Sequence, residues 1–171
     1  MILYLAPGAC SLADHIALHE AGLNFDHVKV DLKTHRTEDG RDYTVINPKG
    51  YVPALLLDSG EILTENIAIL SWISDQSIPA LFGDFVRYRL LEALAYVSTE
   101  IHKSFKPYFT PGATEDAKAS AGQTILNRLT LIAEWLNQDY LTCGCEPGVT
   151  RDGAGVSVLQ AAARSRRKHW R

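Results

Sequence analysis

The hydrophobic pattern of the chain changes once, near residue 77, and this change limits the folds open to it. Before that point, short apolar runs alternate with helical periods in the order strand, helix, strand, long loop, hairpin, helix. After it, every regular pattern has helical spacing. A strand–helix–strand unit favours a parallel pair of strands, and a hairpin adds an antiparallel edge. We therefore predict a small α/β sheet with helices packed on it, followed by an all-α domain.

The first strand is expected at residues 2–6, before the turn residues Pro7 and Gly8. Ser11, with Asp14 three residues later, predicts a capping box for the helix that follows. The apolar face of that helix would carry Leu12, Ile16, Ala17 and Leu23.

A second strand is expected at 27–31 and a hairpin at 54–63, with a long polar connection, 33–50, between them. Thr64 is expected to cap a helix that runs from Glu65 to about residue 76.

The second half of the chain predicts two amphipathic helices. The spacing of apolar residues favours one helix over 87–105, and Thr114, followed by two acids, predicts the cap of another. The apolar stripes would be Leu90, Leu94, Val97 and Ile101 in the first helix and Ile125, Leu129, Ile132 and Leu136 in the second.

These patterns predict four segments. Residues 1–77 would form the α/β domain, 78–86 a linker, and 87–141 a partial helical domain. Residues 142–171 would form a poorly ordered tail, in which six Lys or Arg residues stand against two acids.

Composition excludes several classes of protein. No stretch approaches the ~20 apolar residues that span a bilayer, and the N-terminus has no basic region typical of a signal peptide. The net charge of −3 gives no reason to expect nucleic acid as a partner, and the tail lacks a lysine run. Three cysteines do not make a disulfide framework, so we expect a reducing cytoplasm.

Cys10 is the first candidate for chemistry. It follows a strand and stands just before a helix, where unpaired N–H groups and the helix dipole favour an anion. A thiol there is expected to have its pKa lowered from ~8.5, which makes the thiolate more available. A small buried residue without a function remains an equal alternative, because cysteine is among the most buried residue types.

Two backbone positions could bind a ligand. If the bond between Val52 and Pro53 is cis, the main chain of Val52 could pair with an extended, peptide-like ligand, although sequence alone favours trans. Thr64, Glu65 and Asn66 open a helix whose N–H groups could hold a carboxylate, and Glu65 could meet an ammonium group. Plain helix capping is the more common role for such residues.

Among the histidines, His102 is expected at the edge of an apolar stripe. There its role could be either packing or function. His15 and His19 have metal-ligand spacing but no third ligand nearby in sequence, so we assign them to the helix surface. Cys143 and Cys145 are too close and too isolated for zinc, and we predict no metal site.

Four sequence blocks resemble the bacterial beta-class glutathione transferases, in the same order, over residues 1 to about 141. They are PGACSLADHIALHEAG, VDLKTHRTEDG, INPKGYVPALLLDSGEILTEN and RYRLLEALAYVSTEIHKSFKPYF. The resemblance implies a thioredoxin-like N-terminal domain, an all-α C-terminal domain and a homodimer. It also implies a bacterial detoxification enzyme.

The resemblance implies a role for each matching residue. Cys10 would contact or disulfide-bond the glutathione sulfur, with Ser11 as a polar neighbour, and the main chain of Val52, before a cis Pro53, would pair with the cysteinyl part. The catalytic residues would be Cys10, Ser11 and His102. The other positions near glutathione would be Glu65 and Asn66 at the γ-glutamyl end, and Thr99, Glu100 and His102 on the helical domain. His35 replaces the usual lysine, so a contact to the glycyl carboxylate would be weaker or pH-dependent.

The implied reaction is attack of the glutathione thiolate on a small hydrophobic electrophile, or thiol–disulfide exchange through Cys10. Glutathione would be the co-substrate, and no metal or redox cofactor would be required. The alternative is a non-catalytic glutathione-binding or redox module, or an inactive truncated remnant.

Besides His35, the chain departs from the family in three places: Ala95 replaces a usual asparagine, residues 78–86 are shorter than the family's loop, and the resemblance stops after Leu141. A shift of reading frame would produce such a tail, which we state as a hypothesis. Without the family's later helices, the apolar faces of 87–137 would be left uncovered, which predicts a marginally stable helical domain.

Overall fold

The computed structural model describes residues 1–77 and 85–135 of the chain. The first range belongs to one compact unit and the second to another. Most of the predicted linker lies outside the described residues, and so does the whole predicted tail with Cys143 and Cys145. The predicted boundaries of the linker and the tail therefore stay predictions.

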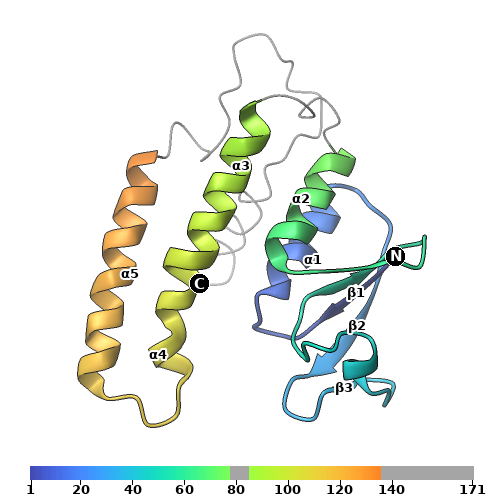
Figure 1. Ribbon diagram of the computed structural model, residues 1–171, viewed down its shortest axis with the longest axis horizontal. Coiled ribbons are helices and arrows are strands. Elements are labelled where there is room, and N and C mark those ends of the chain that lie inside the picture. The colour runs from blue at the N-terminus through green and yellow to red at the C-terminus, as the bar shows by residue number, and fades with distance from the viewer. Residues whose placement is uncertain (78–84, 136–171) are drawn as a thin grey trace, which may run out of the picture. The chain divides into compact units, whose positions relative to one another are not determined.

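The first unit is a five-stranded mixed sheet with two helices (Figure 1). The strand order is β3-β2-β1-β4-β5, with β1 and β2 parallel and the other pairs antiparallel. The predicted parallel pair and hairpin are thus confirmed. The elements are β1 (Ile2–Leu5), α1 (Ser11–Glu20), β2 (Asp26–Asp31), β3 (Arg36–Thr37), the 3₁₀ turn η1 (Tyr43–Val45), β4 (Ala54–Leu56), β5 (Ile62–Thr64) and α2 (Asn66–Ser77).

Strands β1 and β4 are buried on both faces of the sheet. Along β1, Leu3 and Tyr4 are both buried and point to opposite faces, as successive strand residues do. Tyr4 and Ala54 belong to a core cluster that also includes Tyr43 from η1. The helices α1 and α2 pack against each other beside the sheet and contribute further buried apolar residues, among them Leu18, Ile69 and Ile73 (Figure 1).

The predicted capping box at the start of α1 is wrong. Cys10, not Ser11, is the N-cap residue, and no side chain caps the helix. The hydroxyl of Ser11 is engaged with the main chain of Ala6 instead, and Asp14 is buried without a hydrogen-bond partner among residues 1–77 and 85–135. The predicted apolar face is only partly confirmed: Ala17 is buried, but Leu12 is 51% exposed. The buried residues of α1 are Ser11, Asp14, Ala17 and Leu18.

Two predictions around the hairpin also need correction. The connection at 33–50 is not structureless, because it contains β3 and η1. Helix α2 begins at Asn66, one residue later than expected, because Glu65 has a left-handed backbone with φ +76°. Thr64 is the last residue of β5, and its hydroxyl accepts a hydrogen bond from Lys49 rather than capping the helix.

The second unit contains helices only among its described residues. They are α3 (Phe85–Tyr96), the π-helical turn η3 (Val97–Ile101), the 3₁₀ turn η4 (His102–Phe105), α4 (Lys106–Phe109) and α5 (Glu115–Trp135). The expected single helix over 87–105 therefore begins two residues earlier and changes its hydrogen-bonding pattern after Tyr96. Three of its four predicted apolar residues, Leu90, Leu94 and Ile101, are buried.

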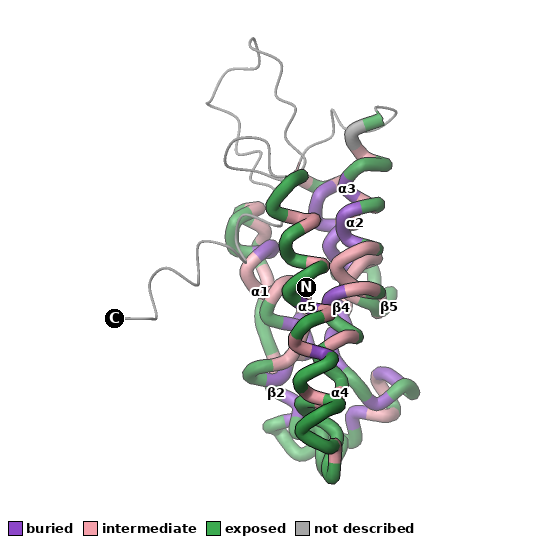
Figure 2. The backbone as a smooth tube through the Cα atoms, turned by 90° about the vertical axis from the view of Figure 1, so that its left-hand side faces the viewer, coloured by how far each residue is buried: buried purple, intermediate pink, exposed green. Residues whose placement is uncertain are grey.

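Helix α5 is exposed over most of its length (Figure 2). Its predicted cap is confirmed, since the N–H of Ala117 donates to the hydroxyl of Thr114 at 3.2 Å. The predicted stripe is only partly buried: Ile125 is buried, but Leu129 is 44% exposed. Within 1–77 and 85–135, no helix is long and apolar enough to cross a membrane.

Candidate functional site

The start of α1 brings Cys10 and Ser11 to the loop that precedes β4. The thiol of Cys10 donates to the carbonyl oxygen of Val52, with 3.4 Å between sulfur and oxygen. The hydroxyl of Ser11 accepts from the N–H of Ala6 at 3.1 Å and lies 3.4 Å from the Ala6 carbonyl oxygen. Ser11 therefore holds the turn that places Cys10, and its predicted role beside a ligand sulfur stays a prediction.

The predicted lowering of the Cys10 pKa is wrong. Partial burial raises the pKa of the Cys10 thiol, and the nearby charge of Asp14 raises it further. Hydrogen bonds from the backbone N–H groups of Cys10 and Ser11 act in the opposite direction but are weaker. Desolvation of the thiolate thus outweighs the favourable field of the helix N-terminus.

The loop before β4 is held by buried side chains. The bond between Val52 and Pro53 is cis, as the family resemblance implies, and both residues are buried. The preceding carbonyl, that of Tyr51, accepts from the hydroxyl of Tyr43 at 3.1 Å and from Nδ2 of Asn47 at 2.7 Å. Val52 lies outside the strand ladder, since β4 begins at Ala54. The core thus fixes the main chain that faces Cys10.

Glu65 carries an exposed carboxylate at the junction of β5 and α2. One of its oxygens accepts from the ammonium of Lys49 and from the hydroxyl of Tyr51, the latter at 2.8 Å. Lys49 lowers the pKa of Glu65 most, and Tyr51 lowers it next. Sequence reasoning missed both partners. The available signal was their position directly before Val52 in the segment INPKGYV.

Asn66 connects the two helices of the first unit. Its Nδ2 donates to the carbonyl oxygen of Cys10 at 3.0 Å, so the first residue of α2 is tied to the N-cap of α1. Its Oδ1 is buried without a hydrogen-bond partner among the described residues. Asn66 therefore ties Cys10 to α2, and its predicted contact with a ligand stays a prediction.

His35 contacts the loop before β4 at Gly50. Its backbone has φ +53°, and its Nδ1 lies 2.9 Å from the carbonyl oxygen of Gly50. The structure therefore brings His35 to the segment that leads to Val52. A contact between His35 and a ligand carboxylate stays a prediction.

Three predicted site residues belong to the second unit, and their place near the ligand stays a prediction. The hydroxyl of Thr99 donates to the carbonyl oxygen of Ala95, near the end of α3, at 2.9 Å. Glu100 forms a 3.1 Å ion pair with Arg128 of α5. His102 is exposed in η4.

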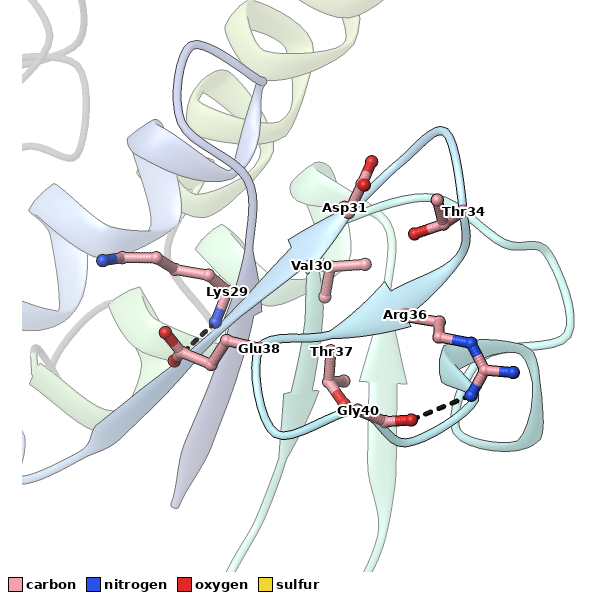
Figure 3. A pocket seen from close by; sticks show the side chains of 8 residues that line it. All are labelled: Lys29, Val30, Asp31, Thr34, Arg36, Thr37, Glu38 and Gly40. Atoms are coloured by element: carbon pink, nitrogen blue, oxygen red, sulfur yellow. Dashed lines mark hydrogen bonds between the residues drawn. The ribbon is translucent and has the colours of Figure 1, made fainter.

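An open pocket of about 430 Å³ lies between β2 and β3, and no predicted site residue lines it (Figure 3). Two of its polar groups are already hydrogen-bonded to other lining residues: the Lys29 backbone N–H donates to the Glu38 carboxylate, and the Arg36 guanidinium donates to the Gly40 carbonyl. The lining residues are Lys29, Val30, Asp31, Thr34, Arg36, Thr37, Glu38 and Gly40.

The histidines of α1 lie at the surface of the first unit, as predicted. His15 is half-buried and His19 is exposed, and their rings pack on each other and on Phe25. The ring of His27 packs on His15 as well. Across the part of the chain that the structure describes, no three His, Cys, Asp or Glu side chains are grouped so as to hold a metal ion.

Comparison with known proteins identifies the family. Residues 9–76 match the family model described as the glutathione S-transferase N-terminal domain. The glutathione S-transferase GstA of Escherichia coli O157:H7 is 44% identical over 149 residues, which are 84% of this chain and 74% of that protein.

Two solved glutathione S-transferase structures are similar to this chain in both sequence and fold. A sphingomonad glutathione S-transferase complexed with glutathione is 43% identical, with a TM-score of 0.79, and the match covers 96% of this chain and 81% of that chain. A bacterial beta-class enzyme of Sphingomonas chungbukensis is 44% identical, with a TM-score of 0.77, and the match covers 95% of this chain and 81% of that chain.

The mixed sheet with α1 and α2 is thus a thioredoxin-like domain, and the helices from α3 onward belong to a helical unit. The chain belongs to the glutathione S-transferase family. The resemblance to the bacterial beta class is confirmed.

Proposed function

We propose that the protein conjugates the thiol of reduced glutathione to small hydrophobic electrophiles. The observation that carries this proposal is the 3.4 Å contact between the Cys10 thiol and the Val52 carbonyl, with the Glu65 carboxylate in the same unit. Val52 offers its main chain to a peptide, and Glu65 offers a negative charge to an ammonium group. A γ-linked tripeptide has a main chain that can pair with Val52 and a free ammonium group that can meet Glu65, and it carries the thiol for the reaction.

The raised pKa of Cys10 defines its part in this reaction. Because burial keeps Cys10 protonated near neutral pH, its S–H remains a hydrogen-bond donor. That donor can move from the Val52 carbonyl to the sulfur of bound glutathione and stabilise the glutathione thiolate. The thiolate then forms a C–S bond with the electrophile, the leaving group departs with its electron pair, and the thiol proton passes to solvent.

The test is retention on immobilised glutathione combined with turnover of 1-chloro-2,4-dinitrobenzene. We expect retention and turnover by the full chain. We expect Cys10→Ala to lose turnover by about tenfold or more, because one donor that stabilises a developing anion is worth that much. Cys10→Ser keeps a donor and should retain more activity than Cys10→Ala, and Cys143→Ser serves as a matched thiol control.

A folded chain that shows neither retention nor turnover would contradict the proposal. Retention without turnover would favour the alternative of a non-catalytic binding module. The names of the relatives, which are transferases, favour the enzyme.

Thiol–disulfide exchange is a second candidate, favoured by the free thiol of Cys10. The Cys10 thiolate would attack one sulfur of glutathione disulfide, forming a mixed disulfide and releasing one glutathione thiolate. Because the pKa of Cys10 is raised, we expect this reaction to be slow at pH 7 and faster at higher pH. Mass spectrometry of the Cys10 peptide after incubation with glutathione disulfide tests it.

A homodimer and a cytoplasmic location complete the proposal. Family membership supports the dimer, and a count of three cysteines supports a reducing compartment. Sedimentation of the purified chain and fractionation of cells test these two points separately.

A further inference from the structure

Asp14 is a buried carboxyl that the proposed function does not use. Its side chain is 0% exposed, and neither of its oxygens has a hydrogen-bond partner among the described residues. A charged carboxylate without partners is unfavourable in such a place, so the neutral acid is preferred. Burial accordingly raises the pKa of Asp14 to about 8.

Asp14 stands one helical turn after Cys10. Residues four apart lie on the same helix face, and side chains lean towards the helix N-terminus, which in α1 is the end where Cys10 stands. The charge of Asp14 raises the pKa of the Cys10 thiol. Each negative charge therefore opposes the formation of the other.

The other charged groups around α1 act less directly. The helix packs on β1 and α2. Among the described groups, Glu65 is the other one whose charge raises the pKa of Cys10, and Lys49 pairs with it. The titratable residues of α1, β1, α2 and the adjoining loops are His15, His19, Glu20, Tyr4, Asp75, Lys49, Tyr51 and Glu65. Asp14 thus differs from Glu65 in having no cation paired with it in the described structure.

We propose that Asp14 is a positioning residue that governs the protonation of Cys10. While Asp14 is neutral, the sulfur can lose its proton, and once Asp14 has ionised, the sulfur is held as a thiol. The pair therefore resists carrying two negative charges, and the reactivity of Cys10 rises with pH less steeply than that of an isolated thiol. In Asp14→Asn this restraint is absent.

The experiment measures the rate at which iodoacetamide alkylates Cys10 between pH 6 and pH 10. In this reaction the sulfur forms a bond to carbon, iodide leaves, and the thiol proton passes to solvent. Mass spectrometry of the Cys10 peptide separates this thiol from Cys143 and Cys145. We expect Asp14→Asn and the unmodified protein to react alike below pH 7, and Asp14→Asn to react about threefold faster or more at pH 9.

Glu20→Gln is the matched control, because it removes one acid from the exposed end of the same helix. Its profile should follow that of the unmodified protein. A profile of Asp14→Asn that superimposes on the unmodified one, or differs by a constant factor at every pH, would overturn the proposal. A Glu20→Gln profile that matches Asp14→Asn would do so as well.

Circular dichroism shows whether each variant is folded. If Asp14→Asn does not fold, Asp14→Ser takes its place. If neither variant folds, the unmodified protein decides, because a simple one-group titration of Cys10 reactivity would refute the coupling. No glutathione is present in the experiment, so its outcome is independent of whether the proposed function is correct.

Discussion

At the scale of single residues, the buried carboxyl of Asp14 makes stability depend on pH in an unusual direction. The pKa is 3.8 for an unburied carboxyl and about 8 in the folded chain. Between these values the folded state binds more protons than the unfolded state, so the free energy of unfolding falls as pH rises, by up to about 1.4 kcal/mol per unit.

Asp14→Asn removes this dependence while keeping the shape of the side chain. We expect the variant to be more stable than the unmodified protein at pH 8, by a few kcal/mol, and the difference to shrink towards pH 4. Urea denaturation followed by circular dichroism between pH 4 and pH 9 measures it. Two stability curves that run parallel over this range would contradict the expectation.

The Glu65 carboxylate gives a second prediction at this scale. Glu65→Gln removes the negative charge offered to an ammonium group, so we expect the Kd for glutathione to rise about tenfold. Stability should change by less than about 1 kcal/mol, because the ion pair with Lys49 is exposed. Titration calorimetry measures the binding, and Glu61→Gln, an exposed acid of the same hairpin, should bind like the unmodified protein.

Because Lys49 and Tyr51 lower the pKa of Glu65, its carboxylate stays charged as pH falls towards the ordinary value of 4.5. Binding through this group should therefore persist between pH 7 and pH 5. A loss of binding with a midpoint near pH 6 would point to another group.

At the scale of elements, the loop before β4 depends on a glycine. Gly50 has φ +72°, and a Cβ there would meet Cε1 of His35 at 3.0 Å. At Gly60 the backbone is similar, with φ +88°, but nothing lies within 4 Å of an added Cβ. Both glycines turn the chain in a left-handed conformation that other residues adopt at a cost.

We expect Gly50→Ala to destabilise the chain more than Gly60→Ala does, by about 1 kcal/mol, because the strained backbone is common to both and the crowding of His35 is not. The same substitution should weaken glutathione binding, since the loop leads to Val52. Adding His35→Ala should recover part of the lost stability. Thermal unfolding of the three variants measures this, and equal losses for the two glycines would refute it.

The helices show where local patterns mislead. In α1, Leu12 was expected inside and is exposed, whereas Asp14 was expected at a cap and is buried. The reason is that the main chain of Ala6, just after β1, engages the Ser11 hydroxyl, which turns the Ser11 side of the helix inward. In α5, by contrast, the cap at Thr114 is a contact between neighbours in sequence and was predictable.

At the scale of the whole molecule, the two units differ in how much they bury. In α5 the buried residues are Ala121 and Ile125, while Leu126, Leu129 and Trp135 are exposed. Helices in proteins gain most of their stability from packing of an apolar face. We expect amide hydrogens of α5 to exchange about a hundredfold faster than those of β1 and β4. Hydrogen-exchange mass spectrometry tests this, and protection of 115–135 equal to that of β1 would contradict it.

The sequence by itself determined the order and type of the main strands and helices, because hydrophobic period and turn residues are properties of neighbouring residues. It also indicated the family, through motifs such as the cysteine before a helix. The tertiary structure decided the chemical state of the site. The pKa of Cys10, the isolation of Asp14 and the pairing of Glu65 with Lys49 all depend on burial or on groups distant in sequence. A charge is stabilised or opposed by what folding places around it, and no local pattern contains that environment.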